Sequence, residues 1–211
     1  MRQHLHKFWA RVKRWVAVPL LAPLLLACEP EDLTLPPEPL GTFRFGHNVV
    51  VTEGVKRGPL SRSISGQTIQ AVIQAEMKNR FARYEGDGLF HIGIKVDSFI
   101  LAEPGIPLVF SPKTLMILGY NVWNDATGEK LFDEFRVISV LPDGQKSIPL
   151  VPSGFTNTAD EQLAALARGA AKTIEFELRK PENAAFFEPG ARREHVDAYR
   201  KELAREAAQR D

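Results

Sequence analysis

The sequence contains a single cysteine, Cys28, and no apolar run longer than the 13 residues from 15 to 27. One cysteine excludes a disulfide within the chain and leaves any metal site dependent on histidines and carboxylates. The apolar run is shorter than the roughly 20 residues that an ordinary membrane-spanning helix requires. The sequence therefore argues against both a disulfide-stabilised fold and an ordinary N-terminal membrane span.

The chain carries an excess of positive charge only at its start. Residues 1–27 hold five Lys or Arg and no acid, which leaves 22 basic against 26 acidic residues and a net charge of −4 for the remainder. Such a domain is a poor candidate for general nucleic-acid binding, so we expect no nucleic-acid partner. The length of 211 residues suggests one domain with a sizeable core.

The first 28 residues have the layout of a secretory signal. A basic stretch from Arg2 to Arg14 precedes the apolar run, and the small residue Ala27 stands directly before Cys28. Leu25-Leu26-Ala27-Cys28 resembles the lipobox of bacterial lipoproteins. The resemblance implies cleavage before Cys28 and lipidation of its thiol, with palmitate-type acyl chains as the membrane anchor. Two or more acyl chains hold a protein stably at a membrane, where one does not.

The anchor implies a place in the bacterial cell envelope, facing the periplasm. Glu29 follows the cysteine, where Asp is the inner-membrane retention signal of well-studied enteric lipoproteins. The outer membrane is therefore the default expectation. We expect the membrane as one partner, reached through the lipid anchor, and an unknown envelope protein or lipid as the other.

The chain divides into four predicted parts. Residues 28–41 form an acylated cysteine and a tether with four prolines and four acids, a composition that favours an extended spacer. Residues 42–181 form an α+β domain, and residues 182–211 form a charged helical tail.

The apolar periodicity predicts strands at 42–52, 89–101, 113–123, 130–141 and 147–151. Phe43, Phe45, Val49 and Val51 are expected to share one face of the first strand, and a bulge is expected near Ser98. Helices are predicted at 67–85, 158–179 and 191–210, the second of them with a capping box formed by Thr158 and Glu161. The fold class is α+β: a two-layer sandwich of an antiparallel sheet of 4–5 strands with helices on one face, plus a charged C-terminal helix.

Two segments are candidate partner contacts. One is an apolar, proline-rich loop, and the other is the thin apolar stripe of the last helix, which could also support an oligomer. The candidate contacts are Ile106, Leu108, Val109, Phe110, Val196, Tyr199 and Leu203.

The search for catalytic motifs is negative. The sequence has neither a P-loop nor a nucleophile elbow, and we expect no catalytic residue, metal or cofactor. The one arrangement left open is a pair of His47 and His91 on neighbouring strands. The turn that begins at Asp125 lacks the further ligands of a calcium loop, and it is interpreted as a hairpin turn with Gly128 at positive φ.

The hairpin Val122-Trp123-Asn124-Asp125, Thr127-Gly128 and Lys130-Leu131-Phe132 is similar to a pattern in small periplasmic lipoproteins, including the periplasmic domain of the curli-secretion lipoprotein. The resemblance extends over residues 67–179 and implies an assembly or accessory role without catalysis. The sequence thus predicts a membrane-anchored, non-enzymatic envelope lipoprotein. The alternative is an envelope-associated hydrolase whose site is assembled only in three dimensions.

Overall fold

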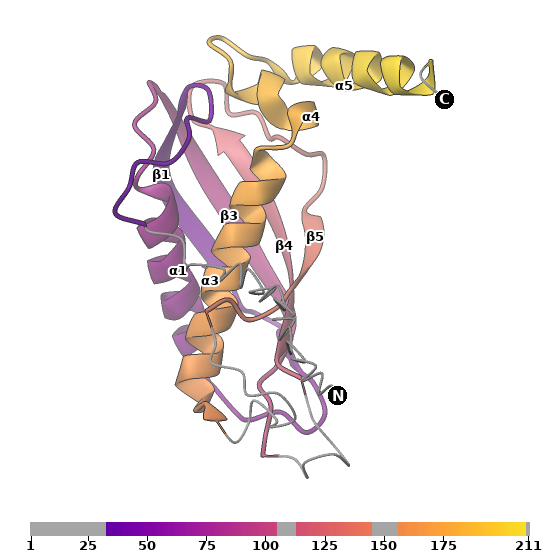
Figure 1. The fold of residues 1–211 in the computed structure, drawn as a ribbon. Helices are drawn as coiled ribbons and strands as arrows, with labels where there is room; N and C mark the ends of the chain where they lie inside the picture. The colour runs from indigo at the N-terminus through magenta and orange to yellow at the C-terminus, as the bar shows by residue number, and fades with distance from the viewer. Residues whose placement is uncertain (1–32, 105–112, 145–155, 210–211) are drawn as a thin grey trace, which may run out of the picture. The chain divides into compact units, whose positions relative to one another are not determined.

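The computed structural model describes residues 33–104, 113–144 and 156–209, which form an open five-stranded sheet with helices (Figure 1). This confirms the predicted α+β class. The strands are β1 (Phe43–Val51), β2 (Lys56–Arg57), β3 (Gly88–Ile100), β4 (Leu115–Asn124) and β5 (Arg136–Val140). The helices are α1 (Gly66–Phe81), α3 (Ala159–Leu178), α4 (Pro181–Ala184) and α5 (Arg193–Ala208), with a 3-10 turn η1 (Ala185–Phe187) before α5.

The sheet has the order β1-β3-β4-β5, and β2 pairs with the C-terminal part of β3. The meander β3-β4-β5 is antiparallel, as predicted, but β1 and β2 run parallel to β3. The prediction of a wholly antiparallel sheet was therefore wrong. β1 reaches β3 through helix α1, and a helical crossover joins strands that run in the same direction.

The first strand differs from its predicted pattern because it contains a bulge. Phe45 pairs with Phe90 and Asn48 pairs with Ile92, so Gly46 and His47 together oppose His91. The extra residue reverses the faces beyond it. Val50 is buried, whereas Val49 and Val51 are 54% and 42% exposed on the opposite side from Phe43, contrary to prediction. The predicted bulge in β3 is confirmed between Val96 and Ser98.

Other helix and strand boundaries also differ from the predicted ones. The strand predicted for 130–141 is a strand only at β5, because residues 125–135 form a turn and a loop along the end of β4. Helix α1 ends at Phe81 rather than at residue 85, and α4 and η1 were not predicted. The strand predicted for 147–151 lies outside the described residues.

Helices α1 and α3 pack side by side against one face of the sheet (Figure 1). Helix α1 begins after Ser65, which accepts from the Thr68 amide at 3.0 Å, and α3 begins at the predicted capping box of Thr158 and Glu161. Their apolar stripes lie in the core, since Ile73, Met77 and Ile174 are fully buried. Helices α1 and α3 thus cover only one of the two faces of the sheet.

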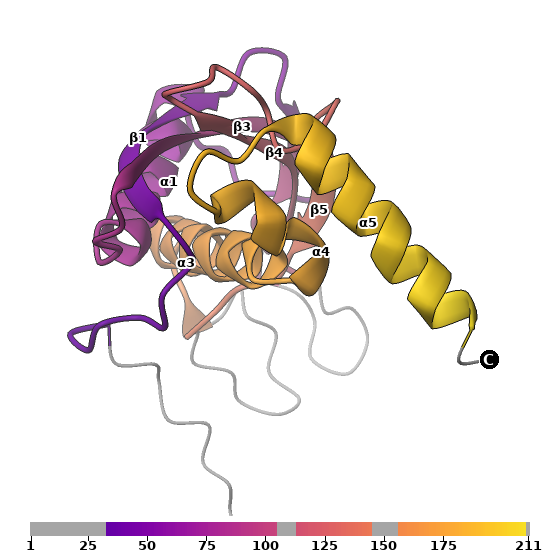
Figure 2. The same cartoon turned by 90° about the horizontal axis from the view of Figure 1, so that it is seen from above.

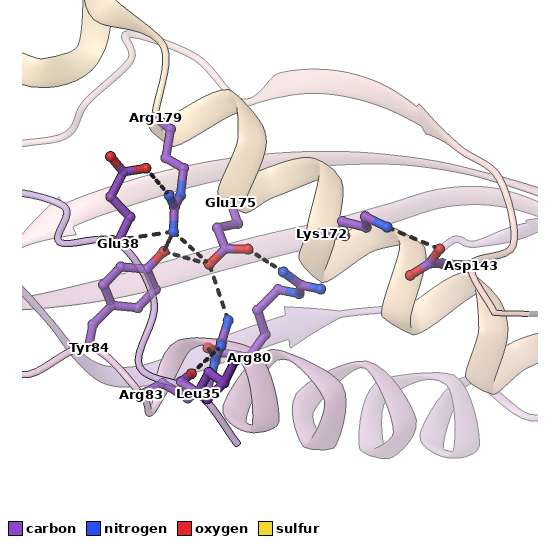
Figure 3. A network of polar contacts seen from close by, with 9 residues as sticks. All are labelled: Leu35, Glu38, Arg80, Arg83, Tyr84, Asp143, Lys172, Glu175 and Arg179. Carbon is purple, nitrogen blue, oxygen red and sulfur yellow. Dashed lines mark hydrogen bonds and ion pairs between the residues drawn. The ribbon is translucent and has the colours of Figure 1, made fainter. Parts of the chain in front are cut away.

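A buried carboxylate holds this helix layer together. Glu175 of α3 forms an ion pair with Arg80 of α1, and both residues are only 5% exposed (Figure 3). Arg83 and Arg179 each place a guanidinium nitrogen 3.5 Å from the same carboxylate. Arg80, the one polar member of the α1 stripe, therefore meets a charge that compensates its burial.

Tyr84 completes the cluster. Its hydroxyl donates to Glu175 and accepts from Arg179 at 2.8 Å (Figure 3). Burial, followed by the hydrogen bond to Glu175, raises the pKa of Tyr84 well above its usual range. The hydroxyl therefore stays protonated and remains a donor throughout the neutral range.

The last helix contacts the domain through its first half, as far as Arg200, which donates to the Glu182 carbonyl and to Asn183. Val196 is fully buried, and Arg193 pairs with Asp133 and donates its amide to Glu129 at 2.6 Å. The Arg193 guanidinium lowers the pKa of the Asp133 carboxyl below its usual value. Beyond Leu203 the helix is exposed, and Figure 2 shows α5 extending outward from α4.

None of the helices in residues 33–104, 113–144 and 156–209 is long and apolar enough to cross a membrane.

We predict that Glu175→Ala lowers the free energy of unfolding by about 3 kcal/mol, because it removes the carboxylate that pairs with the buried Arg80. Urea denaturation of the mature protein measures the change. Glu202→Ala, on the exposed part of α5, is the matched control and should shift stability by less than about 0.5 kcal/mol. The double variant Arg80→Met/Glu175→Leu should recover part of the loss. A loss below about 1 kcal/mol for Glu175→Ala would contradict the assignment.

Candidate functional site

No helix of the described residues covers the second face of the sheet, which we call the open face. Side chains of β3 and β4 alternate, so those next to the buried Ile92 and Val122 point away from the helices. The open face combines apolar, aromatic and imidazole side chains. It is made of His47, Val49, Val51, His91, Gly93, Trp123, Phe135 and Val137.

The open face contains a hollow of about 460 Å³, within the usual size range of ligand sites. Most of its lining is apolar. It is lined by His47, Val49, Val51, His91, Ile92, Gly93, Ile94, Trp123, Asn124, Asp125, Gly128 and Phe135.

A glycine makes room for the aromatic part of this lining. A Cβ atom on Gly93 would lie 2.6 Å from the Trp123 ring and 3.6 Å from the Phe135 ring. The two aromatic rings meet at an angle of 64°, with their centroids 5.9 Å apart. Without a side chain at residue 93, Trp123 can lie over β3 and form one side of the hollow.

The polar part of the hollow is a cluster of His47, His91 and Asp125. The imidazole rings have centroids 4.0 Å apart, and His91 Nε2 lies 2.9 Å from Asp125 Oδ1. The sequence left the histidine pair open, and the structure brings the two rings together. The contribution of Asp125 was missed, although its position in the turn after β4 was a usable signal.

The β1 bulge determines the chemistry of His91. The backbone amide of His47 donates to His91 Nδ1 at 3.3 Å, so we assign the ring proton to Nε2, which donates to Asp125. Both ring nitrogens are thereby engaged. Gly46 is required here, because a Cβ atom on it would lie 2.5 Å from the His91 ring.

The hydrogen bonds of His91 and the composition of the lining define the chemistry available in the hollow. With both nitrogens engaged, His91 has no free nitrogen to act as a general base or a metal ligand. The lining of the hollow includes no serine, threonine, cysteine or lysine. Among the described residues, no group of three or more His, Cys, Asp and Glu is placed to hold a metal ion.

Of the residues predicted from sequence to contact a partner, the three that the structure describes belong to α5. Val196 is fully buried in the core and is not accessible at the surface of the folded domain, whereas Tyr199 and Leu203 are half-buried on α5. Ile106, Leu108, Val109 and Phe110 lie outside the described residues, as do Cys28 and the residues of the lipobox.

No known protein family and no curated protein matches the chain. Among solved structures, a Caulobacter crescentus CB15 protein described as a "putative lipoprotein" aligns with a TM-score of 0.34 and 13% identity, over 59% of this chain and 85% of that chain. A Xanthomonas campestris protein of family DUF330 aligns with a TM-score of 0.28 and 8% identity, over 66% of this chain and 91% of that chain. Likeness at this level shows neither a family nor an activity for this chain.

Trp123 provides a direct test of the hollow, because it is the only tryptophan after residue 15. We predict that Gly93→Ala displaces the Trp123 ring, reduces the hollow and costs about 1–3 kcal/mol of stability. Tryptophan fluorescence of the mature protein should shift to longer wavelength. Lys95→Ala, on the same face of β3, is the control and should leave the emission unchanged. An unchanged spectrum for Gly93→Ala would show that the ring does not lie over residue 93.

Proposed function

We propose that this protein is a bacterial envelope lipoprotein, anchored to the membrane through acylated Cys28, whose domain binds an envelope protein without catalysing a reaction. The proposal for the anchor rests on the basic stretch, the apolar run and the lipobox-like Leu25-Leu26-Ala27-Cys28. We further propose that the anchored domain faces the periplasm, with the outer membrane favoured by Glu29.

The observation that supports the binding role is the open face with its apolar hollow. Val49 and Val51 of β1 and Phe135 and Val137 beside β4 are all exposed by 42–61%. These side chains extend beyond the hollow from one edge strand to the other, so the apolar surface is wider than a small ligand requires. Apolar surfaces of this kind on soluble domains mark interaction sites, and a hollow within one is suited to an anchoring side chain of a partner.

An envelope-associated hydrolase remains the alternative function, supported by the His91–Asp125 pair. A histidine oriented by a carboxylate supplies two of the three members of a hydrolytic triad, but the second nitrogen of His91 accepts from the His47 amide rather than from a nucleophile. A hydrolase would need that nitrogen to be released when substrate binds. Activity against envelope material that is lost in His91→Ala would favour this alternative.

The anchor can be tested with wild type beside Cys28→Ala. Intact mass should show that the wild-type protein has lost residues 1–27 and gained acyl chains, and fractionation should place it in the membrane. Cys28→Ala should lack the added mass and should leave the outer-membrane fraction. A wild-type protein that carries no lipid would refute the anchor.

The binding role can be tested with a photo-reactive residue at position 49, inside the hollow, in growing cells. We expect one cross-linked product with a second protein, and the same probe at the exposed Lys78 of α1 should not form it. Val51→Asp should reduce the product about tenfold, because a charge would be buried against the partner. A product formed only with lipid, or only with a second copy of this chain, would contradict a protein partner.

A further inference from the structure

The segment before β1 is fixed to the domain, although its composition predicts an extended spacer. Leu40 is 7% exposed and belongs to the core. Gly41 has φ of +50°, and a Cβ atom on it would lie 2.4 Å from the Phe187 carbonyl oxygen. Thr42 then donates its amide to the same carbonyl at 2.7 Å. The chain therefore enters the domain along one fixed path beside η1.

Two arginines of the buried cluster hold the residues before Leu40. Arg83 donates to the Leu35 carbonyl at 3.0 Å, and Arg179 lies 3.1 Å from the Glu38 carboxylate and donates to the Glu38 carbonyl at 3.3 Å (Figure 3). Arg179 also lies 3.5 Å from the Glu175 carboxylate, so this arginine lies between Glu38 and the buried cluster. The acidic segment and its binding surface are complementary in charge. We call residues 35–38 the strap.

The strap is held more weakly than Leu40, which follows it. Glu38 is 84% exposed at its side chain, so its ion pair with Arg179 is screened by salt and individually weak. Leu40, by contrast, cannot leave without exposing core surface. The strap is therefore releasable, whereas the contacts from Leu40 onward are not.

The strap limits how far the domain can stand from a lipid anchor. A fully extended chain spans at most about 3.6 Å per residue, so the seven residues from Cys28 to Leu35 reach at most about 25 Å. If the strap is released, the first fixed residue is Leu40, and the limit rises to about 43 Å. Docking of the strap thus lowers the maximum reach from about 43 Å to about 25 Å.

The docked strap also orients the domain. It lies at the end of the fold that contains the start of β1, the start of β3 and the last turn of α3. The opposite end contains the end of β3, the start of β4 and the start of α3. At 1.5 Å per residue, the 20 residues of α3 separate the two ends by about 30 Å.

From these contacts we propose that the docked strap holds the domain close to the lipid surface, with the η1 end facing the membrane and the opposite end presented away from it. This inference rests on the proposed anchoring at Cys28. It adds the orientation of the domain and a limit on its distance from the membrane, both of which depend on Arg83 and Arg179.

Energy transfer to a lipid-linked acceptor tests the proposal. The lipidated full-length mature protein is reconstituted in vesicles of phosphatidylethanolamine and phosphatidylglycerol. Because the chain has one cysteine and the anchor occupies it, a single cysteine introduced at Glu188 or at Asp160 carries the donor dye. Both positions are exposed, the first beside η1 and the second at the start of α3. Wild type should give higher transfer from position 188 than from position 160.

Glu38→Arg should release the strap by repulsion from Arg179 and lower the transfer from both positions by about twofold. Glu53→Arg, the same charge change on an exposed turn, is the matched control and should leave transfer unchanged. High salt should lower the transfer of wild type but not that of Glu38→Arg. Circular dichroism checks that Glu38→Arg is folded, and the salt dependence of wild type tests the strap without any substitution.

Equal transfer for Glu38→Arg and Glu53→Arg at low salt, or equal transfer from positions 160 and 188 in wild type, would overturn the proposal. Failure of the anchor itself is distinguishable, because a protein without acyl chains would not float with the vesicles at all.

Discussion

The carboxylate of Glu175 is the contact on which the arrangement of this domain depends. It pairs with Arg80 of α1, accepts from Tyr84 after that helix, and lies within 3.5 Å of Arg83 and Arg179. Removing the Glu175 carboxylate would take away the one group that all three arginines share. The two helices are thereby held together on one face of the sheet, and the second face is left without a helix among the described residues.

Two glycines and a bulge determine which side chains lie on the open face. The extra residue in β1 turns Val49 and Val51 outward and brings the His47 amide to His91. Gly46 leaves room for the His91 ring, and Gly93 leaves room for Trp123. The result is an apolar hollow beside a histidine whose two nitrogens are already engaged. This hollow is the site at which we propose that a partner protein binds.

Much of the fold could be predicted, because its elements are specified locally. The stripe of α3 repeats at helical spacing, Thr158 and Glu161 form their capping box, and Gly128 has the positive φ that the turn requires. The parallel pairing of β1 was missed, although a strand, helix and strand in succession favour it. The candidate site was less predictable. The sequence left a pair of His47 and His91 open as one possibility. It assigned neither Asp125 nor the exposed valines to the candidate site.

The sequence by itself determined the three long helices and most of the longer strands, because capping, turn chemistry and apolar spacing act between residues a few positions apart. Only the tertiary structure decided which distant residues meet. His47 and His91 are 44 positions apart and Arg80 and Glu175 are 95 apart. Their contacts depend on strand register, on a one-residue bulge and on the packing of two helices. Each of these is selected by the burial of the whole core rather than by neighbouring residues.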